Sequence, residues 1–276
     1  MAEISSAEVV KLRKSTGAGM MDCKKALQEA DGDFDKAIEI IRKKGQLVAS
    51  KRADREANEG VVLAKVSTDM KTGVMIVLSS ETDFVAKNQN FISFAESVLD
   101  LALTKLPANL DELKKLNLGS NPVTDAINMQ VSAIGEKIEL SFYEKLKAAH
   151  VIAYVHPGNK LASLVALNKT ISNPQIGKDI AMQVAAMDPV AVDKDKIPQH
   201  IIDKEIEIGK DQARREGKPE EILEKIAVGK LNKFYKEKTL HNQEFIKDNK
   251  KSILQYLHEH DKELAVTDFV RYSLKD

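Results

Sequence analysis

Glycine is followed by lysine at four places in the chain, and such a pair ends the glycine-rich loop that cradles nucleotide phosphates. That loop also needs a serine or threonine directly after the lysine, because the hydroxyl binds the magnesium ion of the nucleotide. The four pairs, whose glycines are at positions 177, 209, 217 and 229, are followed by Asp, Asp, Pro and Leu. The sequence therefore predicts no nucleotide-binding loop of this class.

Three alternating aspartates, Asp31, Asp33 and Asp35, resemble the start of a calcium-binding loop. The sixth position of that loop requires glycine and the twelfth requires glutamate, but Lys36 and Arg42 stand there. We therefore interpret these aspartates as residues that cap helices.

Two other groups of residues could carry chemistry. His258 and His260 are separated by one residue, which places their imidazoles on different sides of a helix. Cys23 follows an acidic residue and has no neighbouring histidine to activate a thiolate, so we expect a small packed side chain. No Ser-His-Asp arrangement or pair of catalytic carboxylates emerges either. The sequence predicts a protein that is not an enzyme and that needs no cofactor or metal.

One short segment, Thr82-Asp83-Phe84-Val85-Ala86-Lys87-Asn88, directly follows a predicted strand. It could be an ordinary helix start, with Thr82 or Asp83 as the cap and Phe84 in the core. It could also be a rigid corner that presents Phe84 to solvent, as an aromatic anchor for the pocket of a partner protein. The segment alone leaves both interpretations open.

The composition limits the class of protein. The 276 residues are 43% hydrophobic and 30% charged, with 42 basic and 42 acidic side chains, so the net charge is zero. Proteins that bind nucleic acids usually carry a basic excess. A single cysteine excludes an intramolecular disulfide and is typical of the cytoplasm. No apolar run approaches the ~20 residues of a membrane span, and the first residues lack the pattern of a targeting signal.

The first 50 residues are predicted to form three short helices. Ser5 or Ser6 can cap the first helix, whose apolar side carries Val9, Val10 and Leu12. Residues 42–55 then contain six basic side chains and one acid, which favours a solvated helix end and a linker, with a phosphate-binding patch as the alternative.

Strand, turn, strand and helix occur twice in this order, about 90 residues apart. The β-branched runs at residues 60–67 and 73–80 predict the first hairpin, and residues 151–154 and 161–167 predict the second. A helix that starts near Pro174 follows the second hairpin. The pattern predicts an α+β core built from two related halves.

Residues 203–238 are rich in charge and are interrupted by Gly217-Lys218-Pro219, within a predicted hairpin of about residues 190–236. We expect an antiparallel helical hairpin with a thin apolar seam, in which Ile202, Ile206 and Ile208 face Ile222, Ile226 and Leu231. Such a projection must bury its seam on its own body, on a partner or on a second copy of the chain.

Three segments carry a resemblance to a known family. They are RKSTGAGMMDCKKAL at residues 13–27, TDFVAKN at residues 82–88, and GKPEEI at residues 217–222 with Lys233-Phe234-Tyr235 after it. With these motifs in this order, the chain resembles the bacterial elongation factor Ts family, the guanine-nucleotide exchange factors of elongation factor Tu.

The resemblance implies an α+β fold. It has an N-terminal three-helix, ubiquitin-associated-like bundle at residues 1–50 and a linker at residues 51–58. The core has a first half at residues 59–148 and a second half at residues 149–276. The second half contains the inserted dimerisation hairpin at about residues 190–236 and a C-terminal module.

The resemblance also implies a translation factor that binds elongation factor Tu with GDP. Such a factor displaces Mg²⁺ from the nucleotide site of its partner, and it stays bound until GTP enters. The segment implied to disturb the magnesium site is Thr82, Asp83, Phe84 and Val85. The other residues implied to contact the partner are Arg13, Met20, Met21 and His156.

The expected partner is therefore elongation factor Tu, with a homodimer through the hairpin as a further expectation. We expect no nucleotide, nucleic acid or membrane to bind directly, and we expect the protein in the cytoplasm. Two rival classes of protein remain. A nucleic-acid-binding module would use residues 42–55, but the chain has only 13 aromatic residues on which bases could stack. An enzyme would need polar residues that converge on one pocket, and the sequence suggests none.

Overall fold

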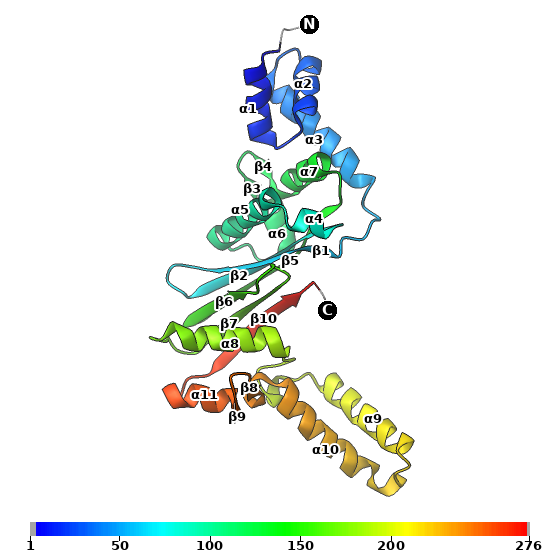
Figure 1. The fold of residues 1–276 in the computed structure, drawn as a ribbon, viewed down its shortest axis with the longest axis vertical. Coiled ribbons are helices and arrows are strands. Elements are labelled where there is room, and N and C mark those ends of the chain that lie inside the picture. The colour runs from blue at the N-terminus through cyan, green and yellow to red at the C-terminus, as the bar shows by residue number, and fades with distance from the viewer. Residues whose placement is uncertain (1–3, 275–276) are drawn as a thin grey trace.

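The computed structural model describes residues 4–274 and shows the expected α+β fold. Figure 1 shows the layers in order along the longest axis of the molecule. A helical bundle lies at one end, two sheets with their covering helices lie in the middle, and a helical hairpin projects at the other end. No helix in the described part is long and apolar enough to span a membrane.

The N-terminal bundle consists of α1 (Ser6–Thr16), α2 (Met20–Glu29) and α3 (Phe34–Ser50). Ser5 and Glu8 form a capping box at the start of α1, which ends at Gly17 with φ 69°. Asp33 caps α3 by accepting hydrogen bonds from two backbone amides. The small core includes Leu12, Cys23, Leu27 and Ile41, whereas Val10, which we expected on the apolar side of α1, is exposed.

The bundle does not complete its core alone. Met129, on α7 (Val123–Ile134) of the next unit, is buried among the side chains of the bundle core. Gly45 on α3 is buried where an added Cβ would lie 3.0 Å from the carbonyl oxygen of Asn128, so α3 and α7 touch backbone to backbone. The buried carboxylate of Asp125 accepts from Arg42 at 2.9 Å and from Gln46 at 3.0 Å. Apolar and ionic contacts therefore fix the bundle on the core.

The first sheet has the order β1-β2-β5, with all strands antiparallel: β1 (Glu59–Val66), β2 (Thr72–Ser80) and β5 (Ile138–Lys147). α5 (Gln89–Lys105) and α7 contribute buried residues to the same apolar cluster as the sheet. In that cluster Val74, Ile76 and Leu78 of β2 lie with Phe91 and Leu99 of α5. Three small elements complete the unit: α6 (Leu110–Lys115), β3 (Asn117–Leu118) and β4 (Asn121–Pro122).

The second sheet has the order β10-β7-β6, from β6 (His150–Val155), β7 (Leu161–Leu167) and β10 (Val266–Ser273). In both sheets a late strand pairs with the second strand of a hairpin. α8 (Pro174–Met187) starts with proline at its first turn, as expected, and buries Ile176, Ile180 and Val184. Met187, which we placed on the same face, is exposed.

The two sheets pack against each other through their other faces. Side chains alternate along β2, so Met75 and Val77 point away from α5 and join Val62 in a second apolar cluster. Leu164 and Ala166 of β7 belong to the same cluster. The result is a four-layer core, in which helices cover the outer face of each sheet (Figure 1).

The expected helical hairpin is present as α9 (Gln199–Arg215) and α10 (Glu220–Lys238). Of the expected seam only Leu231 is buried, because Ile208 and Ile222 are exposed and Ile202, Ile206 and Ile226 are only half-buried. The other buried residues of the two helices are Gly209, Ala213, Leu223 and Ala227. An added Cβ on Gly209 would lie 3.1 Å from Cα of Ala227, so small residues let the two helices approach closely.

The hairpin joins the second half at a narrow root, where Val190 and Leu240 form backbone hydrogen bonds with Lys238 and Ala191. Short elements surround the root: η1 (Lys194–Lys196), η2 (Leu240–Asn242), β8 (Glu244–Phe245), β9 (Asp248–Ser252) and α11 (Ile253–His260).

Candidate functional site

Phe84 lies on α4 (Asp83–Ala86), a single helical turn that directly follows β2. Its side chain is 83% exposed, the largest value among the exposed large hydrophobic residues of the described chain. The interpretation of Phe84 as a core residue is therefore wrong, and the exposed aromatic corner is what the structure contains. We call residues 81–86 the aromatic corner.

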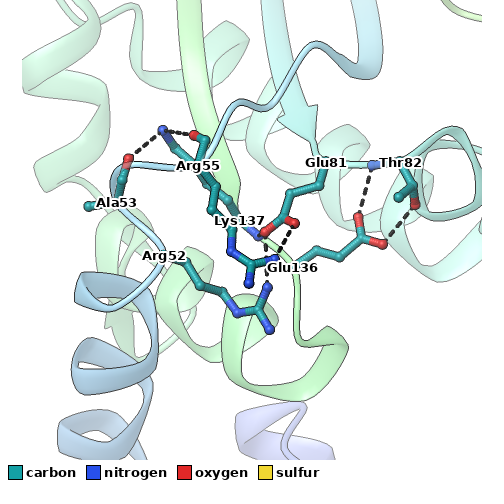
Figure 2. Close-up of polar contacts among 7 residues, drawn as sticks. All are labelled: Arg52, Ala53, Arg55, Glu81, Thr82, Glu136 and Lys137. Carbon is teal, nitrogen blue, oxygen red and sulfur yellow. Dashed lines mark hydrogen bonds and ion pairs between the residues drawn. The ribbon is translucent and has the colours of Figure 1, made fainter.

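Thr82 begins the turn and is held by a carboxylate from a distant part of the sequence. Its hydroxyl accepts from the amide of Val85 at 3.5 Å, which caps α4. Glu136, in the loop between α7 and β5, accepts from the Thr82 amide at 3.0 Å and from its hydroxyl at 2.7 Å. Figure 2 shows both oxygens of Glu136 directed at Thr82.

Glu81 holds the other side of the corner. Its carboxylate accepts from the backbone amide of Lys137 at 2.6 Å and from Arg52 and Arg55 at 3.0 Å each (Figure 2). These partners hold the pKa of Glu81 below its usual value; the amide of Lys137 contributes most, and burial opposes the shift. The ammonium of Lys137 donates in turn to the carbonyl oxygens of Ala53 and Arg55. Linker, corner and the loop before β5 therefore form one polar network.

The remaining residues of the corner differ in their burial. Asp83 accepts from Lys87 at 2.6 Å, and this contact lowers the pKa of Asp83. Val85 is half-buried and packs against the core of the first sheet, while Ala86 is buried. Thus one side of the turn is anchored in the core, and Phe84 projects on the other.

The turn between β6 and β7 carries His156 and lies near the corner. His156 is exposed, and its Nδ1 lies 2.8 Å from the hydroxyl of Tyr154. Lys160, in the same turn, pairs with Glu59 at 2.5 Å, and Glu59 lies opposite Ser80, the residue directly before the corner. Charges from both halves of the core therefore face this region.

The three bundle residues lie on a separate surface. Arg13 is exposed in the last turn of α1, and Met20 and Met21 at the start of α2 are 40% and 65% exposed. Figure 1 places α1 and α2 at the end of the molecule, beyond α7, whereas α4 lies beside the first sheet. The structure brings the corner and the His156 turn together and leaves the bundle residues apart from them.

The basic segment 42–55 is largely paired with acids. Arg42 binds Asp125, Lys43 and Lys44 bind Glu39 and Asp22, and both arginines of the linker bind Glu81. These pairs disfavour the phosphate-binding alternative. In the described residues no group of three or more His, Cys, Asp or Glu side chains could hold a metal ion. Cys23 is buried, as expected for a packed side chain.

The sequence motifs did not indicate Glu81 and Glu136, the two carboxylates whose hydrogen bonds hold the corner in place. Glu81 had one signal, a charged side chain immediately after a buried strand. Glu136 had none, because it binds Thr82 across 54 positions of sequence.

Comparisons with known proteins agree with the motifs. The family described as "Elongation factor TS" matches residues 81–276. A protein of Porphyromonas gingivalis named "Elongation factor Ts" is 50% identical over 268 residues, 97% of each chain. Proteins of the same name from Christiangramia forsetii and Cytophaga hutchinsonii are also 50% identical, over 99% of this chain and 100% of each relative.

Proposed function

Since the chain belongs to the elongation factor Ts family, we propose that this translation elongation factor binds elongation factor Tu with GDP and accelerates release of the nucleotide. It performs no covalent chemistry and acts through protein–protein contact. We expect it in the cytoplasm, where translation occurs.

The mechanism is a competition between two ligands of one partner. Magnesium neutralises the phosphates of GDP, so displacing the ion weakens nucleotide binding. By reciprocity, the factor and the nucleotide weaken each other's binding to the same extent. The factor therefore stays bound after GDP leaves, and it is expelled when GTP enters.

The observation that carries this proposal is that Phe84 is 83% exposed on a turn that the hydrogen bonds of Thr82 and Glu81 hold in place. A large exposed aromatic costs little to desolvate, and when it is held in one orientation it loses little entropy on binding. We propose that Phe84 enters an apolar pocket of elongation factor Tu, and that Thr82, Asp83 and Val85 accompany it toward the magnesium site.

The affinity comes from more than one unit. We propose that the bundle at residues 1–50 contacts the partner through Arg13, Met20 and Met21. The second half, residues 149–276, does so through His156. The linker at residues 51–58 and the first half at residues 59–148 fix the aromatic corner between these contacts.

The hairpin suggests a second association. Ile208, Ile222 and Val228 are 38%, 41% and 44% exposed on α9 and α10, although the seam between these helices is already filled. We propose that the hairpin forms a homodimer through these side chains. Sedimentation over a range of concentrations tests this, and a chain that stays monomeric at high concentration contradicts it.

The test of exchange is release of fluorescent GDP from elongation factor Tu with and without the chain. We expect strong acceleration by the native protein and little by Phe84→Ala. An equal rate with and without the native chain would show that the proposed function is wrong.

A further inference from the structure

The aromatic corner has very little structure of its own. α4 is four residues long, and an isolated helical turn is unstable in water because nucleation costs more than one hydrogen bond returns. Phe84 projects away from the core, so its ring contributes little packing to hold the turn. The orientation of Phe84 therefore depends on the packing of Val85 and Ala86 against the core and on contacts from other segments.

Glu136 forms hydrogen bonds with Thr82, the residue at which the turn starts. Its two oxygens accept separately from the two donors of Thr82, the backbone amide and the hydroxyl. Hydrogen bonds to a charged acceptor are about twice as strong as neutral ones. The pair fixes both the backbone and the side chain of the residue that caps α4.

We propose that Glu136 is a positioning residue for nucleotide exchange, which orients the Phe84 turn through Thr82 while Glu81 holds the loop of Glu136 against the linker. The inference rests on the proposed function for its effect on exchange. The orientation of the turn is a property of the free protein and can be measured without a partner.

The position requires a carboxylate and not merely a side chain of that length. In Glu136→Gln one acceptor becomes an NH₂ group, which can meet the Thr82 hydroxyl only by donating to its oxygen. The variant is neutral, so both bonds to Thr82 lose their charge assistance, and the hydroxyl proton loses its carboxylate acceptor. From the usual strength of such bonds, we expect the turn to open about tenfold more often.

Opening of the turn can be followed by hydrogen exchange, because the amides of Val85, Ala86 and Lys87 bond to Thr82 or Asp83. We expect these amides to exchange about tenfold faster in Glu136→Gln, with no change at β2. Asp100→Asn is the matched control, since Asp100 forms an exposed ion pair with Lys65 outside the network.

A fluorescent reporter gives a second measurement. The chain contains no tryptophan, so Phe84→Trp introduces a single indole at the corner. Its residual anisotropy should fall when Glu136→Gln or Thr82→Val is added, and should be unchanged with Thr82→Ser, which keeps the hydroxyl. Thr82→Val also covers the case in which Glu136→Gln does not fold.

The exchange assay then links orientation to function. For Glu136→Gln we expect the maximal rate of GDP release to fall about threefold to tenfold, with the half-saturating concentration of partner changed less than about twofold. A mobile corner with a normal maximal rate would overturn the positioning role, and so would unchanged protection and anisotropy. If the native chain does not accelerate release, the proposed function fails, while the mobility measurements still decide whether Glu136 orients the turn.

Discussion

The aromatic corner and the helical hairpin α9–α10 both present apolar side chains to solvent, but they are built in opposite ways. The corner is one helical turn held from outside by Glu136, which accepts from Thr82, and by Lys137 and the linker arginines, which donate to its own Glu81. The hairpin is long and is held by a seam of small residues, with exposed ion pairs such as Arg214–Glu220 on its surface. The difference teaches that exposure alone does not identify a contact surface; what distinguishes the corner is that distant residues fix the direction of one side chain.

The largest expected effect separates the two regions in the exchange assay. Phe84→Ala should weaken the productive complex by ~2–4 kcal/mol, which is ~30-fold to ~1,000-fold, because it removes the aromatic side chain that we propose is buried by the partner. The melting temperature of the free protein should move by only a few degrees, since Phe84 is exposed.

The corresponding change in the hairpin is the replacement of residues 199–236 by a short Gly-Ser turn. The hydrogen bonds at the root, such as Leu240 to Ala191, should keep the second half folded, and most exchange activity should remain. Abolished exchange in a folded deletion would place the hairpin in the partner-facing site and break the comparison.

The hairpin contains one glycine in its seam, Gly209, and one on its exposed surface, Gly229, and substitution should have opposite effects at the two positions. Gly209→Val should destabilise the hairpin by ~1–3 kcal/mol, because its Cβ already meets Ala227 at 3.1 Å. Gly229→Ala on α10 should stabilise it by ~0.5–1 kcal/mol, because a Cβ there meets nothing within 4 Å. Urea unfolding followed by helical circular dichroism measures both. Equal effects would mean that the helices are not closely packed.

The bundle methionines test whether a flexible contact matters as much as a rigid one. Met20 and Met21 are exposed at the start of α2, and methionine adapts to irregular surfaces. The double change to alanine should weaken partner binding roughly tenfold, measured by titration calorimetry. Loss of the helical circular dichroism of the bundle would instead mean that these side chains support the fold.

The two regions should also respond differently to pH. Burial lowers the pKa of His241, at the root of the hairpin, below its usual value of 6.5, and the nearby Asp193 only partly offsets this. Because the unfolded state binds the proton more readily, the root should lose stability as pH falls below 6.5. Glu81 has a lowered pKa, so its contribution to the corner is lost only as pH falls below 4.5.

Hydrogen exchange at about pH 7.5 and about pH 5.5, corrected for intrinsic rates, should show loosening at Leu240 and His241 but not at the corner. His241→Gln should remove most of this dependence, and His258→Gln should leave most of it. If the amides of the corner exchange faster at the lower pH while those of the root do not, the assignment of this pH dependence to His241 is wrong.

The smallest expected effect is that of Asp83→Ala. Asp83 is next to Phe84 but forms only an exposed pair with Lys87, which contributes little. GDP release should slow by about twofold. A loss as large as that of Phe84→Ala would mean that the carboxylate acts directly on the partner's magnesium site.

Much of the fold could be predicted because local patterns determine it. Asp33 and Pro174 lie at helix starts, and the β-branched runs form hairpins, as their residue types require. The seam of the hairpin could not be predicted in this way. Close packing selects Gly209 and Ala227 for their small size, whereas hydrophobicity drew attention to Ile208 and Ile222.

The candidate site was predicted only in part. Phe84 could be located because it follows a strand within a distinctive motif, but local sequence could not decide between a buried and an exposed ring. The bond from Glu136 to Thr82 depends on β2 and β5 lying side by side, which is a tertiary property. Sequence patterns therefore located the side chain that projects and missed the residues that hold it.

The insertion of Met129 into the bundle core has a consequence for the order in which the protein takes shape during synthesis. The ribosome makes α1, α2 and α3 first, yet their apolar cluster is closed only when a residue of α7 arrives. During synthesis from the N-terminus, the native core of the bundle therefore lacks one of its buried side chains until residue 129 has been made.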